Sequence, residues 1–261
     1  MRGEAATVVA ERAGGVLNVS INRPDKRNAL SRAVLGELKR VFSGHSGAQD
    51  LRVAVLRGAG EKSFAAGGDL RDLAQVRTRA DTRRMAEQAR DALEAIRSFP
   101  VPVVAALNGD ALGGGAELAV ACDFRVAASH ARIGFIQGRL NIATAWGGGA
   151  DLMRLVGPAR ALRLLAAAEL LDAPGAQRAG LVDEVGAPGE PLPALIERFI
   201  APFLQQVPQV LRAYKALAIA HRSGRPAAGI RRLETRQLVE TWVHPDHWQA
   251  ADKILDGRKP T

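Results

Sequence analysis

The chain has 261 residues, of which 47% are hydrophobic and only one is cysteine, and its formal net charge is +9. This length suffices for one large domain or for a core with a small appendage, and a mean hydropathy of −0.04 is typical of a globular protein. No apolar run approaches the roughly 20 residues that cross a bilayer, which excludes a membrane span. The single Cys122 excludes an intrachain disulfide, and residues 1–5 lack a signal-peptide core, so a cytoplasmic protein is expected.

The basic residues are scattered along the chain rather than clustered. An isoelectric point near 10.7 would suit nucleic acid, a membrane surface or a phosphorylated ligand. Aromatic residues make up only 4% of the chain, too few for the stacking platforms that bind bases. The composition therefore argues against a nucleic-acid ligand and agrees with a small ligand that carries phosphates.

The first part of the chain alternates strand-like and helix-like segments. Residues 8–21 predict a β-hairpin with two glycines at its turn. Ser31 can cap a helix, and a charged amphipathic helix is expected over residues 82–98. Because the alternation continues to Val185, it predicts stacked ββα units with the helices outside.

From residue 191 onward the pattern is helical, with proline and glycine at the expected boundaries. We therefore divide the chain into a core, residues 1–190, and a helical C-terminal region, residues 191–261. The helices of the second region are expected over about 191–206, 208–222, 227–243 and 245–256.

The most informative motif is GGGAE at residues 113–117, which follows a strand-like run and an Asn-Gly turn. Glycines that open a helix offer unpaired backbone N–H groups which a ligand oxygen can approach closely. One turn later Glu117 stands among apolar residues, which should raise its pKa. N–H groups that bind an anion beside a buried carboxylate indicate enolate stabilisation coupled to proton transfer. The competing interpretations are tight helix–strand packing for the glycines and a buried salt bridge for Glu117.

A second glycine turn, AAGGDL at residues 65–70, follows the strand-like segment 53–58. Two such turns from separate βα units would supply the paired N–H donors of an oxyanion hole. The structural alternative is an ordinary turn in which Asp69 caps a helix.

In order and spacing, these segments resemble the enoyl-CoA hydratase/isomerase (crotonase) superfamily. The resemblance covers almost the whole chain and implies an α/β fold of the crotonase (ClpP-like) type, a spiral of repeated ββα units. It also implies a helical C-terminal region that covers the site and builds a homotrimer or a dimer of trimers. The matching segments are INRPDKRNAL at 21–30, AGGDL at 66–70, NG and GGGAE within 108–117, and AGLVDEV at 179–185.

The resemblance further implies a lyase of fatty acid metabolism that acts on an acyl-CoA thioester. Gly68 and Gly114 would donate their N–H groups to the thioester oxygen, and Glu117 would be the first of the family's two catalytic glutamates. Apart from the coenzyme A of the substrate, no cofactor and no metal is expected. Contacts with the substrate or its CoA portion are expected from Lys26, Arg27, Ala66, Asp69 and Trp146.

The chain departs from the two-glutamate pattern at Gln137, which we expect to act beside Glu117 in the catalytic site. An amide can orient water or substrate through hydrogen bonds, but it cannot exchange a proton at neutral pH. This argues against concerted hydration by two carboxylates and against Δ3,Δ2-enoyl-CoA isomerisation. Trp146 precedes a glycine pair, as in the branch that contains ethylmalonyl-CoA decarboxylase, and its ring can either pack on the turn or contact substrate.

We therefore predict an enoyl-CoA hydratase-type lyase. Two alternatives remain open: a decarboxylase of a malonyl-CoA-like substrate, and a non-catalytic homologue that binds acyl-CoA or RNA.

Overall fold

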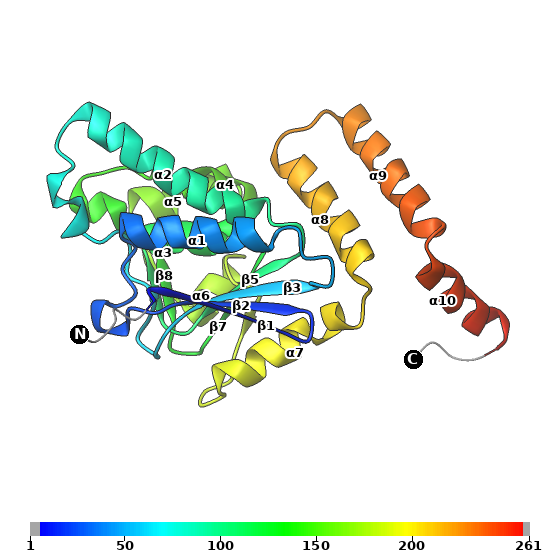
Figure 1. The fold of residues 1–261 in the computed structure, drawn as a ribbon. Coiled ribbons are helices and arrows are strands. Elements are labelled where there is room, and N and C mark those ends of the chain that lie inside the picture. Colours follow the sequence, from blue (N-terminus) through cyan, green and yellow to red (C-terminus); the bar gives the residue numbers. More distant parts are fainter. Residues whose placement is uncertain (1–5, 258–261) are drawn as a thin grey trace.

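The computed structural model describes residues 6–257, which form two sheets with helices around them (Figure 1). The larger sheet has the strand order β1-β2-β3-β5-β7-β10 and the smaller one β4-β6-β8-β9. The larger sheet consists of β1 Val8–Ala13, β2 Val16–Ile21, β3 Val53–Gly58, β5 Val103–Leu107, β7 Phe124–Ala127 and β10 Glu184–Val185. The smaller sheet consists of β4 Ser63–Ala65, β6 Asp110–Leu112, β8 Arg132–Gly134 and β9 Leu170–Asp172.

Helices connect and cover these strands. Those of the first part are α1 Arg32–His45, α2 Arg79–Arg97, α3 Gly114–Ala121, α4 Gly148–Val156, α5 Pro158–Ala166 and α6 Ala173–Arg178. Three short 3₁₀ turns are η1 Pro24–Lys26, η2 Asp72–Gln75 and η3 Ile136–Leu140. The last four helices are α7 Leu192–Leu204, α8 Pro208–Arg222, α9 Ala227–Trp242 and α10 Pro245–Leu255.

The strands confirm the predicted repeat of ββα units. The hairpin of β1 and β2 is antiparallel with Val8 opposite Ile21, and β2, β3, β5 and β7 then pair in parallel. In each following unit the first strand joins the larger sheet and the second joins the smaller one, as in β3 with β4, β5 with β6, and β7 with β8. In each of these units the chain therefore passes from the larger sheet to the smaller one, and a helix or 3₁₀ turn follows the second strand.

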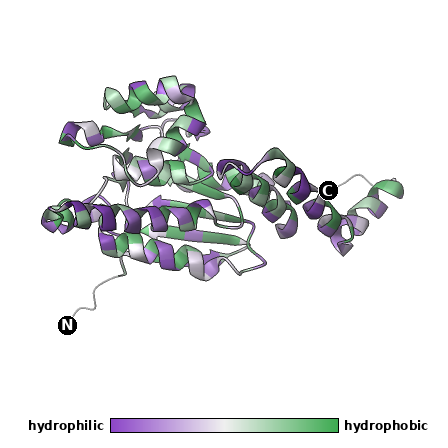
Figure 2. Cartoon of the chain, turned by 90° about the horizontal axis from the view of Figure 1, so that it is seen from above, coloured by the Kyte–Doolittle hydropathy of each residue, from purple (hydrophilic) through white to green (hydrophobic). Residues whose placement is uncertain are grey.

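Apolar residues on both faces of the larger sheet hold the helices in place. On one face, α1 and α2 contribute Leu38 and Leu93 to the main core. On the other face, α7 packs Leu195 and Ile196 against the strands in a second core. Figure 2 shows the strands as mostly hydrophobic between helices of mixed character, as a sheet buried on both faces requires.

The caps explain where the first helices begin. Ser31 Oγ accepts a hydrogen bond from the N–H of Val34 at 3.3 Å, which confirms the predicted start of α1. Helix α2 begins three residues before the expected segment because Thr78 Oγ1 accepts from the N–H of Asp81 at 3.1 Å. A capping side chain accepts a hydrogen bond from a free N–H of the first turn, so it can start a helix before the first residue of the amphipathic pattern.

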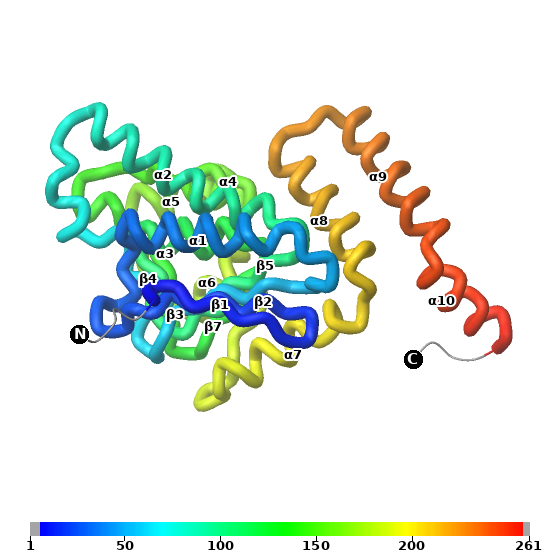
Figure 3. Tube along the Cα trace, in the orientation of Figure 1, coloured from blue at the N-terminus to red at the C-terminus, as the bar shows by residue number. Residues whose placement is uncertain are grey.

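Helix α9 packs against α8, and α9 and α10 lie beyond α8 as seen from the two sheets (Figures 1 and 3). Helix α8 is fixed to the body by the buried Lys215, which forms an ion pair with Asp123 next to β7. Helices α9 and α10 leave large apolar side chains exposed, among them Leu238, Trp242 and Trp248. No helix in residues 6–257 is both long and apolar enough to cross a membrane.

Candidate active site

The fold brings the two predicted oxyanion turns into contact. Gly114 is the first residue of α3, so its N–H is among the four that have no acceptor within the helix. The other turn approaches it closely: a Cβ built on Gly67, whose φ is +99°, would lie 3.6 Å from Gly114 N. Two N–H donors from separate ββα units therefore lie at neighbouring turns.

Residue Leu30 holds the turn that contains Gly68. Leu30 N donates to Gly67 O at 2.8 Å, and Asp69 N donates to Leu30 O at 3.0 Å. These two bonds join Leu30 to the residues on either side of Gly68, and the N–H of Gly68 takes part in neither of them. That N–H is therefore available to a ligand oxygen.

One of the three glycines at the start of α3 fits the packing interpretation. A Cβ on Gly115 would lie only 2.8 Å from the carbonyl carbon of Ala65 in β4. Glycine at this position lets the helix approach the strand closely. This contact sets the distance between the helix start and the neighbouring turn.

Glu117 lies one turn into α3 with 2% of its surface exposed. Its Oε1 accepts a hydrogen bond from the N–H of Trp146 at 3.3 Å. Burial raises its pKa to about 7, although backbone hydrogen bonds from Trp146 and Gly148 and the charge of Arg97 act in the opposite direction. Among the described residues no Lys or Arg forms an ion pair with Glu117, so the salt-bridge interpretation finds no partner there. A carboxyl with this pKa can both accept and release a proton near neutral pH.

Gln137 lies in η3 next to the start of α3. Its Cδ is 4.0 Å from the position that a Cβ on Gly113 would occupy. Both amide atoms, Nε2 and Oε1, are buried, and neither has a hydrogen-bond partner among the described residues. An unsatisfied buried polar group costs about 1–3 kcal/mol, so this side chain favours a ligand group that can both donate and accept.

Trp146 contacts both predicted oxyanion glycines with its indole. A Cβ built on Gly114 would lie 2.6 Å from Cη2 of the ring, and one on Gly68 would lie 3.8 Å from the same atom. The residue is 6% exposed. It therefore packs on the glycine turns, as one of the two sequence interpretations expected, and its contact with substrate stays a prediction.

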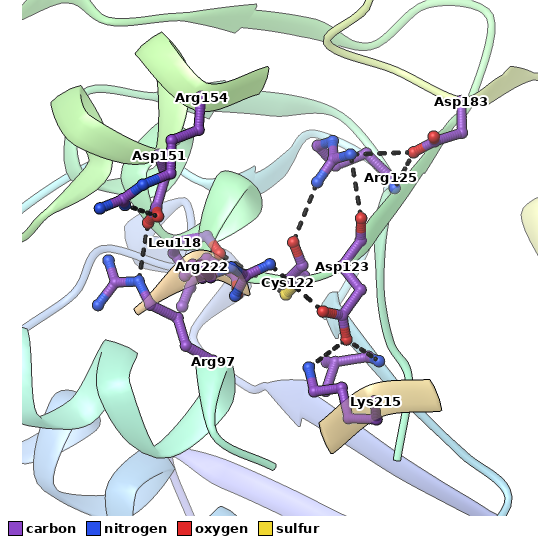
Figure 4. A network of polar contacts seen from close by, with 12 residues as sticks. Arg97, Leu118, Cys122, Asp123, Arg125, Asp151, Arg154, Asp183, Lys215 and Arg222 are labelled. Carbon is purple, nitrogen blue, oxygen red and sulfur yellow. Dashed lines mark hydrogen bonds and ion pairs between the residues drawn. The ribbon is translucent and has the colours of Figure 1, made fainter. Parts of the chain in front are cut away.

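No sequence motif indicated the residue that hydrogen-bonds to the backbone of Trp146. Arg97, at the end of α2, donates from Nη2 to Trp146 O at 3.0 Å and from Nε to Asp151 Oδ2 at 2.7 Å. Figure 4 shows Arg97 and Arg154 on either side of Asp151, which is in α4. In the sequence Arg97 is one of many charges on an amphipathic helix, and its partner is distant in the chain.

The predicted CoA-binding residues lie beside the turn that contains Gly68. Lys26 and Arg27 are exposed, and Arg27 O accepts from the N–H of Ala66 at 3.1 Å. Asp69 accepts from Arg23 Nη2 at 2.9 Å. Burial alone would raise the pKa of Asp69, but the hydrogen bonds from Arg23 and from backbone N–H groups outweigh it and hold the pKa below its usual value. Asp69 thus fixes the turn, and its contact with substrate stays a prediction.

The fold places two glycine turns and a buried carboxyl in neighbouring ββα units, an arrangement that suits an enzyme. The chain belongs to the enoyl-CoA hydratase/isomerase family, whose model matches residues 11–260. Over 187 residues it is 38% identical to a short-chain-enoyl-CoA hydratase of Clostridium acetobutylicum, covering 72% of this chain and 71% of the relative. Over 211 residues it is 34% identical to an ethylmalonyl-CoA decarboxylase of Danio rerio, covering 79% and 69%. The crystal structure of an enoyl-CoA hydratase from Bacillus anthracis superposes with a TM-score of 0.89 at 31% identity, covering 98% of both chains. The family and the crotonase fold expected from the sequence are confirmed.

Replacing Arg97 by methionine should raise the pKa of Glu117 further, because the positive charge of Arg97 favours the carboxylate. The change also leaves Asp151 without its closest partner, at a cost of about 3 kcal/mol, the lower end of the usual range because Arg154 still contacts it. The pH dependence of the rate and urea unfolding would measure the two effects. The double variant Arg97→Met/Asp151→Asn should regain free energy of unfolding relative to Arg97→Met, because it leaves no charged Asp151 without its partner. The inflection in its pH–rate profile should remain at the higher pH. An inflection unchanged in both variants would show that Arg97 does not act on Glu117.

Proposed function

We propose that the protein is an enoyl-CoA hydratase-type lyase that uses Glu117 as its only acid–base group. The observation that carries the proposal is the position of this carboxyl, with a pKa of about 7, beside the start of α3 and the Gly68 turn. The family match and the hydratase relatives support the same reaction.

The reaction would run through a thioester enolate. The N–H groups of Gly68 and Gly114 receive the thioester oxygen and stabilise the charge that develops on it. The oxygen of a water bonds to Cβ of the enoyl group, its proton passes to Glu117, and the electrons of the double bond move to the thioester oxygen. Glu117 then returns the proton to Cα, and the carboxylate is restored. Gln137 orients the water through its amide, which has both a donor and an acceptor without a partner.

The remaining parts of the proposal concern binding and assembly. Lys26 and Arg27 contact the phosphates of CoA, which is part of the substrate, and no further cofactor takes part. The exposed apolar side chains of α9 and α10 support association with further copies of the chain, as a homotrimer or a dimer of trimers. We place the protein in the cytoplasm, and we expect no nucleic-acid ligand.

Incubation with crotonyl-CoA tests the proposal. A hydratase should consume the enoyl thioester and form 3-hydroxybutyryl-CoA, which mass spectrometry identifies by the added water. If the folded protein leaves crotonyl-CoA and longer enoyl-CoA esters unchanged, the hydratase assignment is wrong.

The second candidate is a decarboxylase of a 2-carboxyacyl-CoA. It is favoured by Gln137, because a neutral amide can donate a hydrogen bond to a substrate carboxylate where a glutamate would repel it. The relative from Danio rerio is named as such a decarboxylase. Loss of CO₂ would generate the same thioester enolate, and Glu117 would protonate its Cα.

Replacing Gln137 by glutamate should separate the two candidates. In a hydratase the second acid–base group should increase the rate on crotonyl-CoA, since such a group can contribute about 10²-fold or more. In a decarboxylase the new charge should repel the carboxylate of ethylmalonyl-CoA and slow the release of CO₂. Each rate is compared with that of the wild type on the same substrate, and Leu140→Ala, an exposed change in the same 3₁₀ turn, serves as the control. If neither substrate reacts before or after the change, the non-catalytic homologue becomes the better account.

A further inference from the structure

The indole of Trp146 lies against the two glycine turns that are predicted to hold the thioester oxygen. Its benzene edge occupies the space next to both glycines into which a side chain would extend: Cη2 and Cε3 would lie 2.6 and 3.1 Å from a Cβ on Gly114. On the other turn, Cη2 and Cζ2 would lie 3.8 and 3.9 Å from a Cβ on Gly68. One flat edge therefore spans the two predicted oxyanion donors.

The backbone of the same residue contacts the other reacting group. The N–H of Trp146 donates to Glu117 Oε1 at 3.3 Å. In the proposed reaction the thioester carbon lies at the glycines and the proton is exchanged at Glu117, so the carbons between them would pass beside Trp146. Trp146 thus borders both ends of the reacting segment.

Several contacts fix the ring in this position. Arg97 Nη2 donates to Trp146 O at 3.0 Å, and Arg97 is itself held by Asp151. On the other side of the turn, a Cβ on Gly148 would lie 2.7 Å from the Cα of Glu117, which leaves the turn no room to move toward α3. Trp146 as a whole is only 6% exposed, so its neighbours enclose it.

We propose that Trp146 determines which acyl chains the protein accepts: the indole closes the acyl end of the site and admits short acyl groups such as crotonyl while excluding long ones. The inference rests on the proposed function, because it takes the thioester oxygen to lie between Gly68 and Gly114. A half-buried neighbour, Leu73, adds to the same wall, since its Cδ1 would lie 3.0 Å from a Cβ on Gly68.

The kinetic test compares crotonyl-CoA with trans-2-decenoyl-CoA. For the wild type, kcat/KM should be at least about tenfold higher on crotonyl-CoA, within the range over which a pocket discriminates between alkyl groups. Trp146→Ala should reduce this preference by about tenfold or more, and Trp146→Phe should fall between the two. Leu162→Ala, which removes an exposed apolar side chain from α5, should keep the wild-type preference.

A binding test separates this inference from the proposed reaction. Butyryl-CoA and decanoyl-CoA are saturated and cannot be hydrated, so calorimetry measures their Kd values whether or not the protein is a hydratase. The ratio of the two Kd values should favour butyryl-CoA in the wild type and change in the same direction as the kinetic ratio in the variants. If no enoyl-CoA is turned over but the Kd ratio follows Trp146, the proposed reaction fails and the role of Trp146 stands.

The inference is overturned if the wild type binds decanoyl-CoA as tightly as butyryl-CoA. It is also overturned if the Kd ratio stays the same in Trp146→Ala and Trp146→Phe. Should circular dichroism show that the alanine variant is unfolded, the phenylalanine variant alone decides, because it keeps an aromatic ring in the core.

Discussion

Replacing Glu117 by glutamine should lower kcat on crotonyl-CoA by about 10²-fold or more, the usual scale for a general acid–base group. Glutamine keeps the size of the side chain and can still accept the hydrogen bond from the Trp146 N–H, but it cannot carry a proton between water and Cα. Stopped-flow measurement of hydration gives kcat, and KM should change less because the change does not alter the oxyanion donors.

The pH dependence of the wild type provides an independent check on the same group. Glu117 must begin the reaction as a carboxylate, and burial holds its pKa at about 7. The value of kcat/KM should therefore fall about tenfold per pH unit below that pH and reach a plateau above it. The glutamine variant should show a low rate without this inflection.

Thermal stability distinguishes catalysis from structure at Glu117. The raised pKa means that the folded protein holds the proton of this carboxyl more tightly than the unfolded chain, so its contribution to stability falls as the pH rises from 4.5 to about 7 and is absent above that pH. The neutral glutamine variant should melt at the same temperature as the wild type or higher at alkaline pH. A variant that keeps its activity but melts several degrees lower would contradict the catalytic assignment.

The sequence predicted those parts of the fold that local patterns control. Prolines mark the beginnings of α8 and α10, which were expected at residues 208 and 245 and are found there. The first helix of the C-terminal region ends at Leu204, two residues before the expected end, because the chain must become extended ahead of Pro208. The repeat of ββα units was also predicted, because the alternation of strand-like and helix-like segments is a local pattern of the sequence.

The parts of the site that were not predicted depend on contacts between distant segments. Arg97 and Asp151 are far apart in the chain, and neither has a local motif that indicates its partner. The sequence also left two interpretations of Trp146, because its position depends on long-range contacts, among them the packing of α4 against α3 and the hydrogen bond from Arg97. The predicted rise of the Glu117 pKa was correct in direction, since the apolar residues around it in α3 are buried as their composition indicates.

Gly114 offers the sharpest test of the oxyanion hole because its position tolerates proline. It is the first residue of α3, where proline fits the helix and where its missing N–H has no acceptor within the helix. The obstacle is Trp146, since any Cβ at this position would meet the indole, 2.6 Å from Cη2. The comparison is therefore made in the Trp146→Ala background, which provides the space.

In that background, Gly114→Pro should lower kcat by about 10²–10³-fold relative to Gly114→Ala, the cost of losing one oxyanion donor. The alanine variant adds a Cβ but keeps the N–H, so the difference between the two isolates the donor from the added bulk. Binding of CoA itself should stay the same in both, because its phosphates contact the chain away from α3 in the proposed mode. Circular dichroism must first show equal helix content, since the argument requires that α3 begins in the same place. Equal kcat values in the two folded variants would show that the N–H of Gly114 does not stabilise the thioester oxygen.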